Sequence, residues 1–189
     1  MNTKVIFLAG VPCSGKTTIF KRIRGKLFQD YTEIKHKSLR LIKSGAGNYY
    51  MLGVFDGSTF EGTDRLSMCV INDALDFIKN LEKNGDKNVV FIEGDRLFNN
   101  RFLTETQAEL YVTSVVPEII AMRHKQRNDN QTERFLRSRQ TKLYNILNKY
   151  PCSALLLNNT ALDSELAACR LCSVANRYLN KGDSKIWLA

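Results

Sequence analysis

Residues 10–17 read Gly-Val-Pro-Cys-Ser-Gly-Lys-Thr and fit the pattern G-x-x-x-x-G-K-[ST]. The two glycines can adopt backbone angles closed to other residues, so the segment can curve around an anion with its N–H groups pointing inward. The lysine ammonium can then reach the β- and γ-phosphates of a nucleotide, and the threonine hydroxyl can bind Mg²⁺. The pattern therefore predicts a phosphate-binding loop, or P-loop.

The sequence on either side gives this loop the neighbours that it needs. Residues 5–9 are all apolar and indicate a buried parallel strand. Residues 18–23 open a helical pattern, and the N-terminus of a helix favours negative charge. We expect nucleotide contacts along the whole loop and its first helical residues, with Thr17 also a metal ligand: Gly10, Val11, Pro12, Cys13, Ser14, Gly15, Lys16, Thr17 and Thr18.

A polar block at residues 56–65 follows an apolar stretch and precedes a helical pattern. Ligands of open α/β sheets bind beyond the carboxyl ends of the strands, so this block is expected opposite the P-loop. Asp56 or Asp64 would accept the proton of an acceptor hydroxyl or orient that group, and Arg65 would position the acceptor. The alternative is an ordinary connector in which Thr63 or Asp64 caps the next helix.

The apolar strand at residues 88–92 leads into Glu93, Gly94, Asp95 and Arg96. An acid at the end of such a strand matches the Walker B position, which holds Mg²⁺ or its water. Either Glu93 or Asp95 fits this role; Glu93 is assigned to the metal and to catalysis, and Asp95 and Arg96 to the acceptor. The Asp-Arg pairs at 64–65 and 95–96 could instead be local salt bridges only.

Five arginines lie within seventeen residues: Arg123, Arg127, Arg134, Arg137 and Arg139. Guanidinium groups match the oxygens of a transferring phosphoryl group, over which negative charge spreads. Helices at 117–128 and from 134 to about 150 would carry them, as a lid over about residues 123–142. Arg123, Arg127 and Arg137 are expected to neutralise the transition state, Arg123 beside the nucleotide and Arg137 beside the acceptor. A solvated basic helix is the alternative.

Helices and strands alternate along the rest of the chain. Helices are expected at residues 16–28, 66–83 and 162–179, a hairpin that returns to the sheet at 33–55, strands at 109–115 and 153–157, and an irregular segment at 97–107. The second arginine helix would bury Phe135, Leu143, Ile146 and Leu147, residues 158–160 would lie at the adenine, and Trp187 would anchor the tail. This order predicts an α/β fold in one domain over residues 1–189: a five-stranded, mostly parallel sheet with helices on both faces and an arginine-rich helical lid.

Charge and cysteine content bound the partners. The formal net charge is +9, and it is uneven: residues 1–49 carry +8, residues 50–122 carry −6 and residues 123–142 carry +5. The two basic segments are compatible with a polyanionic partner, although such a surface can also be merely solvated. Five scattered cysteines indicate reduced thiols in a cytoplasm, with Cys169 and Cys172 packing a helix. No apolar run approaches membrane-spanning length, so no membrane partner is expected.

The order of elements resembles the nucleoside monophosphate kinase-like branch of P-loop proteins. Residues 51–55 (Met-Leu-Gly-Val-Phe), 60–67 (Phe-Glu-Gly-Thr-Asp-Arg-Leu-Ser), 93–96 and 137–142 (Arg-Ser-Arg-Gln-Thr-Lys) are similar to bacteriophage P-loop kinases whose proposed role is to phosphorylate 5-hydroxymethyluracil in DNA. The resemblance implies a P-loop kinase fold, ATP and Mg²⁺ as cofactors, and double-stranded DNA containing 5-hydroxymethyluracil as the partner, in the host cytoplasm. A closed kinase site would need the base extruded from the duplex.

Two other functions remain open from the residues alone. The first is a kinase acting on a free nucleoside or nucleotide, and the second is a non-enzymatic, nucleotide-dependent DNA-binding protein. An enclosed acceptor pocket would favour the first alternative, and loss of both Asp-Arg pairs from the crevice would favour the second. A GTPase is not expected because the guanine-reading Asn-Lys-x-Asp motif is absent, and the signature regions of a motor ATPase are absent as well.

Overall fold

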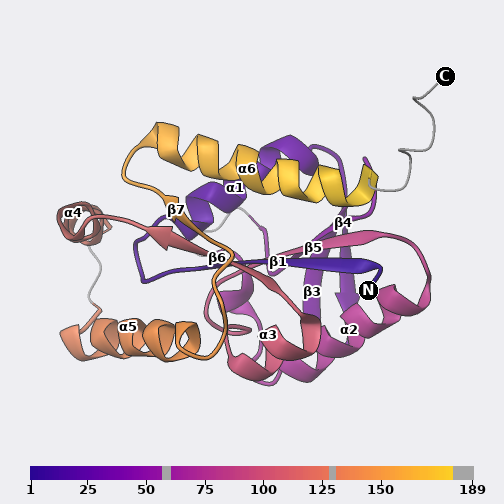
Figure 1. The fold of residues 1–189 in the computed structure, drawn as a ribbon, viewed down its shortest axis with the longest axis horizontal. Helices are drawn as coiled ribbons and strands as arrows, with labels where there is room; N and C mark the ends of the chain where they lie inside the picture. Colours follow the sequence, from indigo (N-terminus) through magenta and orange to yellow (C-terminus); the bar gives the residue numbers. More distant parts are fainter. Residues whose placement is uncertain (57–60, 128–130, 181–189) are drawn as a thin grey trace.

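One β-sheet of seven strands forms the centre of the computed structural model, which describes residues 1–56, 61–127 and 131–180. The strands lie side by side in the order β2-β3-β4-β5-β1-β6-β7 (Figure 1). Their bounds are β1 Thr3–Ala9, β2 Tyr31–His36, β3 Leu39–Ser44, β4 Tyr49–Leu52, β5 Asn88–Glu93, β6 Glu109–Ser114 and β7 Ala154–Leu157. The block β4-β5-β1-β6-β7 is parallel throughout, whereas β3 pairs antiparallel with both β2 and β4.

The predicted number of five strands is wrong. The segment expected to make a hairpin returning to the sheet does return, because β4 pairs with β5, but it also adds two antiparallel strands at the edge. The tight turn between these strands has Lys37 at φ 55°. Most side chains of β2 are exposed, so this strand lacks the apolar alternation that would have marked it.

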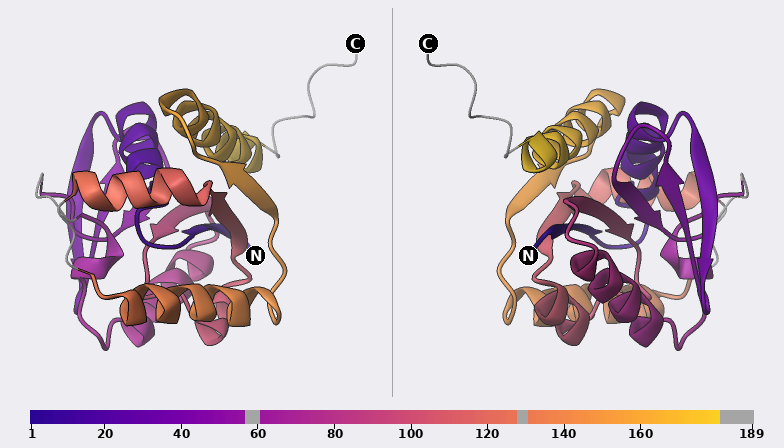
Figure 2. Two further views of the ribbon diagram at one scale, coloured as in Figure 1. Left: turned by 90° about the vertical axis from the view of Figure 1, so that its left-hand side faces the viewer. Right: turned by 90° about the vertical axis from the view of Figure 1, so that its right-hand side faces the viewer.

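Helices cover both faces of the sheet, as predicted (Figure 2). α1 Lys16–Leu27 and α6 Ala161–Asn180 lie on one face, and α2 Ile71–Lys83, α3 Asn100–Thr106 and α5 Glu133–Leu147 on the other. Each face has its own apolar core, with Phe20, Phe28 and Phe91 in the first and Phe7 and Phe102 in the second. α4 Pro117–Gln126 buries none of its side chains and lies beyond the ends of β6 and β7 (Figure 1).

Several predicted boundaries differ from the structure. The segment 97–107 is irregular only at residues 97–99 and at residue 107, because residues 100–106 form α3: Asn99 caps this helix through the Phe102 N–H at 2.9 Å, and Phe102 and Leu103 are buried. α2 begins at Ile71 rather than at 66, after the short 3₁₀ turn Thr63–Arg65. On α6, Cys172 packs in the core as expected, whereas Cys169 is exposed. Predictions for residues 57–60, the helix break at 128–130 and Trp187 lie outside the described residues.

The parallel strands end at one common edge of the sheet. β1 leads there into the P-loop, β5 into Gly94, β6 into the segment before α4, and β7 into Asn158. Because parallel strands share their direction, residues far apart in the chain gather at this edge. The fold therefore places the P-loop, the acidic segment after β5 and the arginine-bearing helices α4 and α5 around one region.

Candidate active site

The P-loop has the local structure that its motif predicts: β1, then a loop, then α1. Gly15 adopts φ 83°, and a Cβ atom there would lie 2.1 Å from Nδ2 of Asn158, so both the backbone angle and the packing require glycine. The Lys16 ammonium donates hydrogen bonds to the carbonyl oxygens of Gly10 and Val11, each at 3.0 Å. The Lys16 side chain thus folds back onto the first two residues of the P-loop.

A buried hydrogen-bond chain holds the middle of the P-loop. The Thr113 hydroxyl on β6 donates to Oγ of Ser14 at 2.6 Å, and the Asn158 amide donates to the Ser14 carbonyl at 2.6 Å. The Ser164 hydroxyl on α6 donates to Oδ1 of Asn158 at 2.5 Å. The side chain of Asn158 is therefore engaged inside the protein, so any contact of residues 158–160 with adenine would have to come from the other two residues or the backbone.

Glu93 is the last residue of β5 and is almost fully buried beside the loop. Its Oε1 accepts a hydrogen bond from the Thr17 hydroxyl at 3.4 Å. Burial raises the pKa of Glu93 to about 7, and the nearby Lys16 ammonium partly opposes this rise. Burial likewise lowers the pKa of Lys16, against the attraction of Glu93. Both groups are thus desolvated charges without full compensation inside the protein.

The Thr17 hydroxyl and the Glu93 carboxylate are oxygen ligands that fit a divalent cation. Within the described residues no cluster of three or more His, Cys, Asp or Glu is arranged to hold a metal by itself. Mg²⁺ is typically bound by one or two protein oxygens together with phosphate oxygens and water, which is what Thr17 and Glu93 beside a P-loop would offer. Gly62, at φ 97°, presses against this site, because a Cβ atom there would lie 2.3 Å from Oε1 of Glu93.

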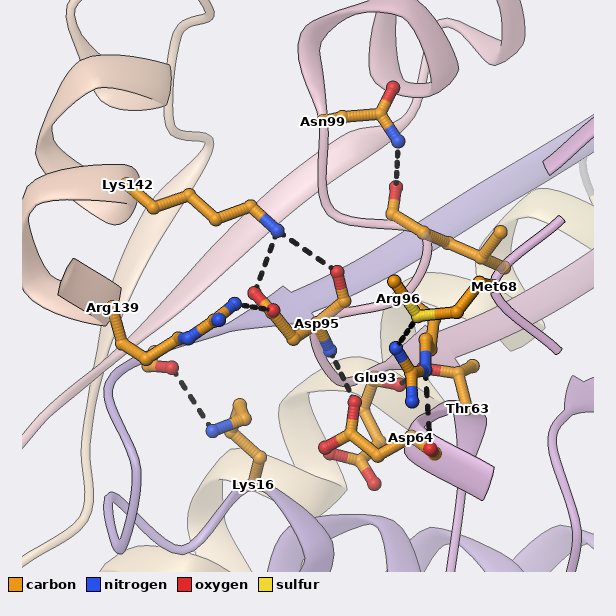
Figure 3. Close-up of polar contacts among 12 residues, drawn as sticks. Lys16, Thr63, Asp64, Met68, Glu93, Asp95, Arg96, Asn99, Arg139 and Lys142 are labelled. Atoms are coloured by element: carbon orange, nitrogen blue, oxygen red, sulfur yellow. Dashed lines mark hydrogen bonds and ion pairs between the residues drawn. The ribbon is translucent and has the colours of Figure 1, made fainter. Parts of the chain in front are cut away.

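Asp64 and the segment after β5 form a second polar group (Figure 3). Oδ1 of Asp64 accepts a hydrogen bond from the Asp95 N–H at 2.7 Å, and the Asp64 carbonyl accepts one from Nε of Arg96 at 3.3 Å. The Thr63 hydroxyl donates to the Glu93 carbonyl at 2.5 Å. The two Asp-Arg segments of the sequence therefore meet in space, joined by contacts between Asp64, Asp95 and Arg96.

A cavity of about 340 Å³ joins these groups. The predicted residues that line it include much of the P-loop together with Lys16, Thr17, Asp64, Glu93, Asp95, Arg96 and Arg127. It is also lined by residues that were not predicted to contact a ligand: Glu61, Phe98, Gln131, Phe135, Arg139 and Leu143. Phe135 was expected to be buried in the core, but it is 37% exposed and faces this cavity, whereas Ile146 is buried as expected.

A second cavity of about 340 Å³ also borders the P-loop. Cys13, Gly15 and Thr18 line it together with Arg123, Arg127 and residues 158–160. The Arg123 guanidinium donates to the Asn158 carbonyl at 2.7 Å and to the Cys13 carbonyl at 3.4 Å. Cys13 and Arg127 line both cavities, so the two spaces adjoin at the middle of the loop.

Three of the residues predicted for catalysis or for the acceptor line neither cavity: Asp56, Arg65 and Arg137. Arg65 forms an ion pair with Asp56. Arg137 is exposed on α5 and pairs with Glu133 at 2.6 Å. The α5 arginine that lines the first cavity is instead Arg139. Helical periodicity was the available signal, because residue 139 lies one turn after Phe135 and one before Leu143, on the inner face, whereas residue 137 does not.

Within the first basic segment, residues 1–49, the lysines and arginines of residues 21–43 are largely paired within the protein. Six of these eight lysines and arginines contact carboxylates: Lys21 and Arg24 at Glu61, Arg22 and Lys26 at Glu165, Lys37 at Asp76, and Arg40 at Glu33. Much of the positive charge that a polyanion would meet is therefore offset locally. Across the described ranges, no helix has the length and apolar character to cross a membrane.

Comparison with known proteins adds only a distant likeness. No protein-family profile matches the sequence, and no curated protein matches it. The chain is similar to an unliganded sugar kinase from Janibacter sp. HTCC2649, with 12% identity and a TM-score of 0.47 over 90% of this chain and 93% of that one. It is also similar to a gluconokinase from Sinorhizobium meliloti 1021, with 10% identity and a TM-score of 0.44 over 95% and 97%. Likeness at this level identifies no activity, so the function is inferred from the residues of the site.

Proposed function

We propose that this protein is an ATP-dependent kinase that transfers the γ-phosphate to a hydroxyl group of a small organic acceptor. One observation carries the proposal: a single cavity holds the P-loop with Lys16, the contact of Thr17 with the buried Glu93, and a group of Asp64, Asp95 and Arg96. The first supplies an anion cradle, the second suits a cation, and the third suits an alcohol. A structural glycine turn would need none of these neighbours.

The residues divide the work of phosphoryl transfer among them. The loop N–H groups would hold the β- and γ-phosphates, and Lys16 would exchange its two backbone carbonyl partners for phosphate oxygens. Thr17 and Glu93 would hold Mg²⁺, which when bound neutralises charge on the phosphate oxygens. Arg127 lines both cavities and would balance negative charge between the nucleotide and the reacting phosphate.

Asp64 is the proposed group for the acceptor hydroxyl. It lines the cavity, and its second carboxylate oxygen can accept a proton or a hydrogen bond while Oδ1 is held by the Asp95 N–H. Asp56, the alternative for this role, is paired with Arg65 away from the lining residues, which favours Asp64. Arg96 beside Asp64 would help to fix the acceptor.

Two acceptors compete. The pairing of the basic segment with carboxylates, and a cavity of about 340 Å³ lined by Phe98 and Phe135, favour a free nucleoside, a nucleotide or another small alcohol. The second candidate is 5-hydroxymethyluracil in double-stranded DNA, which the sequence resemblance implies and whose single extruded ring would suit the same aromatic lining. A non-enzymatic module is disfavoured because Asp64, Asp95 and Arg96 line the crevice. A cytoplasmic location remains part of the proposal.

The test is phosphate transfer from γ-labelled ATP with Mg²⁺. The acceptors are a panel of free nucleosides, nucleotides and polyols, together with duplex DNA containing 5-hydroxymethyluracil and the matched thymine duplex. Label in a free acceptor supports the first candidate, and label in the modified duplex alone supports the second. The kinase assignment would be refuted by a folded protein that labels none of these acceptors, does not turn over ATP and does not bind MgATP.

A further inference from the structure

Asp95, in the segment that follows β5, forms ion pairs with two residues of α5. Its carboxylate is paired with the Arg139 guanidinium and, at 2.8 Å, with the Lys142 ammonium, and its carbonyl accepts a second bond from Lys142 at 3.1 Å (Figure 3). Both cations come from one turn of α5, and Asp95 lies two residues after Glu93. The helix is therefore attached directly to the segment that carries the candidate metal ligand.

The two cations of this triad differ in what they can reach. Arg139 lines the cavity that contains Lys16, Thr17 and Glu93, and Lys142 does not. Lys142 contacts two oxygens of Asp95, and its ammonium lies 5.8 Å from the centre of the Phe98 ring. Lys142 thus has the contacts of an anchor that holds α5 in place.

Arg139 has donor capacity left over. A guanidinium offers five N–H donors in a planar fork, which matches phosphate oxygens as well as carboxylates. In the part of the chain that the structure describes, its Nε is buried and has no hydrogen-bond partner. The group lies 4.7 Å from the centre of the Phe135 ring, so stacking on that ring fixes the plane of the fork. An unsatisfied buried donor beside an anion site has a natural partner in an incoming phosphate.

We propose that Arg139 is the α5 residue that contacts the transferred phosphate, and that in the ligand-free protein Asp95 holds it in reserve while Lys142 keeps α5 attached. This inference rests on the proposed kinase function and deepens it. It assigns the contact to Arg139 in place of Arg137, whose guanidinium is exposed and paired with Glu133. When the triphosphate enters, its charge would compete with Asp95 for the guanidinium, and the Lys142 contacts would remain.

The test uses a readout that needs no acceptor. MgADP with aluminium fluoride mimics a phosphoryl group in transfer. A residue that contacts this group therefore contributes more to the affinity for MgADP with aluminium fluoride than to the affinity for MgADP alone. Affinities for MgADP with and without aluminium fluoride are compared for wild type and four variants: Arg139→Ala, Arg139→Lys, Lys142→Ala and Arg134→Ala. Arg134 is an exposed arginine of the same helix and serves as the matched control.

We expect Arg139→Ala to lose about 100-fold in affinity for MgADP with aluminium fluoride, while its affinity for MgADP alone changes less than about 3-fold. Arg139→Lys keeps a cation for Asp95 but lacks the fork, so it recovers only part of this loss. Lys142→Ala lowers the melting temperature and keeps fluoride-dependent tightening within about 3-fold of wild type, and Arg134→Ala matches wild type.

The outcomes separate the two proposals. If aluminium fluoride increases the MgADP affinity of wild type and of Arg139→Ala by the same factor, the role of Arg139 is refuted and the kinase function stands. If Arg139→Ala and Lys142→Ala lose the same amount, Arg139 acts only as a structural anchor, which also refutes the role. If wild-type protein binds MgADP but aluminium fluoride adds nothing, phosphoryl transfer itself is refuted.

Discussion

The Thr17 hydroxyl at the start of α1 and the Glu93 carboxylate at the end of β5 lie within hydrogen-bonding distance, at 3.4 Å. The two residues are separated by 76 positions in the chain, and parallel pairing of β1 with β5 brings them together. This contact joins the phosphate cradle to a buried acid. The first prediction concerns the cost of that acid.

Ligand-free protein should be stabilised by Glu93→Gln at alkaline pH. Burial raises the pKa of Glu93 to about 7 from its ordinary value of 4.5. A carboxyl whose pKa rises on folding stabilises the fold at low pH, and this contribution is lost as the pH increases from about 4.5 to about 7. At pH 8 the ionised form therefore costs about 3 kcal/mol, which the neutral amide avoids.

Thermal unfolding at pH 5 and pH 8 measures this effect. The variant is expected to melt several degrees above wild type at pH 8, with a much smaller gain at pH 5, and to have lost phosphate transfer. If variant and wild type had equal melting temperatures at both pH values, burial of the ionised Glu93 would carry no cost in stability, and the assignment of Glu93 as a metal ligand would be weakened.

Substitution of Lys16 by alanine should abolish transfer. The Lys16 ammonium donates hydrogen bonds to the Gly10 and Val11 carbonyl oxygens of the cradle, so it is the cation positioned at the predicted phosphate site. We expect kcat to fall about 1000-fold or more, because the transition-state charge loses its central counter-charge. Lys35→Ala, at an exposed position of β2, is the control and should retain wild-type kcat. Wild-type activity in the Lys16 variant would refute the P-loop assignment.

Asp64→Asn should lower kcat by about 100-fold or more and leave ATP affinity unchanged. Asparagine keeps an oxygen that can accept the hydrogen bond from the Asp95 N–H, so the local structure persists while the basic oxygen is lost. Steady-state kinetics with titrated ATP and acceptor measure both quantities, with the exposed Asp86→Asn as control. A fall in ATP affinity instead would assign Asp64 to the metal site.

Removal of the Asn158 side chain should loosen the nucleotide site. Asn158→Ala leaves the Ser14 carbonyl without its Asn158 donor in a buried setting, at a cost of about 1–3 kcal/mol of folding stability, whereas the Ser164 hydroxyl keeps its contact with the Thr160 carbonyl at 3.2 Å. Because Ser14 belongs to the cradle, KM for ATP is expected to rise about 10-fold with a smaller change in kcat. The exposed Asn148→Ala provides the comparison. An unchanged KM in a destabilised variant would limit this chain of bonds to a structural role.

Local patterns located the parts of the site that depend on neighbours in sequence. The P-loop is defined by spacing within eight residues, and strands β5, β6 and β7 by continuous apolar runs. Placement of Asp64, Glu93, Asp95 and Arg96 in one cavity was predicted as well, because all of them follow strands or loops at the carboxyl edge. These inferences needed only chain order and the rule that parallel strands share an edge.

Side-chain direction could not be obtained in the same way. Arg137 and Arg139 are two residues apart. Helical periodicity favours residue 139 for the inner face, and the packing of α5 against the sheet places Arg139 there and leaves Arg137 paired with Glu133 in solvent. Glu61 entered the cavity because Gly62 lies against Glu93, a contact between segments 31 residues apart. The weak strand β2 forms because β3 supplies its hydrogen bonds, so its exposed side chains gave no pattern to detect.

The phosphate cradle, the parallel strands and the acids and arginines available for chemistry could be predicted from the chain alone, since each is encoded by spacing along a short stretch. How these charged side chains pair depends on the tertiary structure: Asp56 pairs with Arg65, Arg137 with Glu133, and Arg139 with Asp95. The physical reason is that a charged side chain pairs with whichever partner the packed backbone brings within a few ångströms, and that distance is a property of the whole fold.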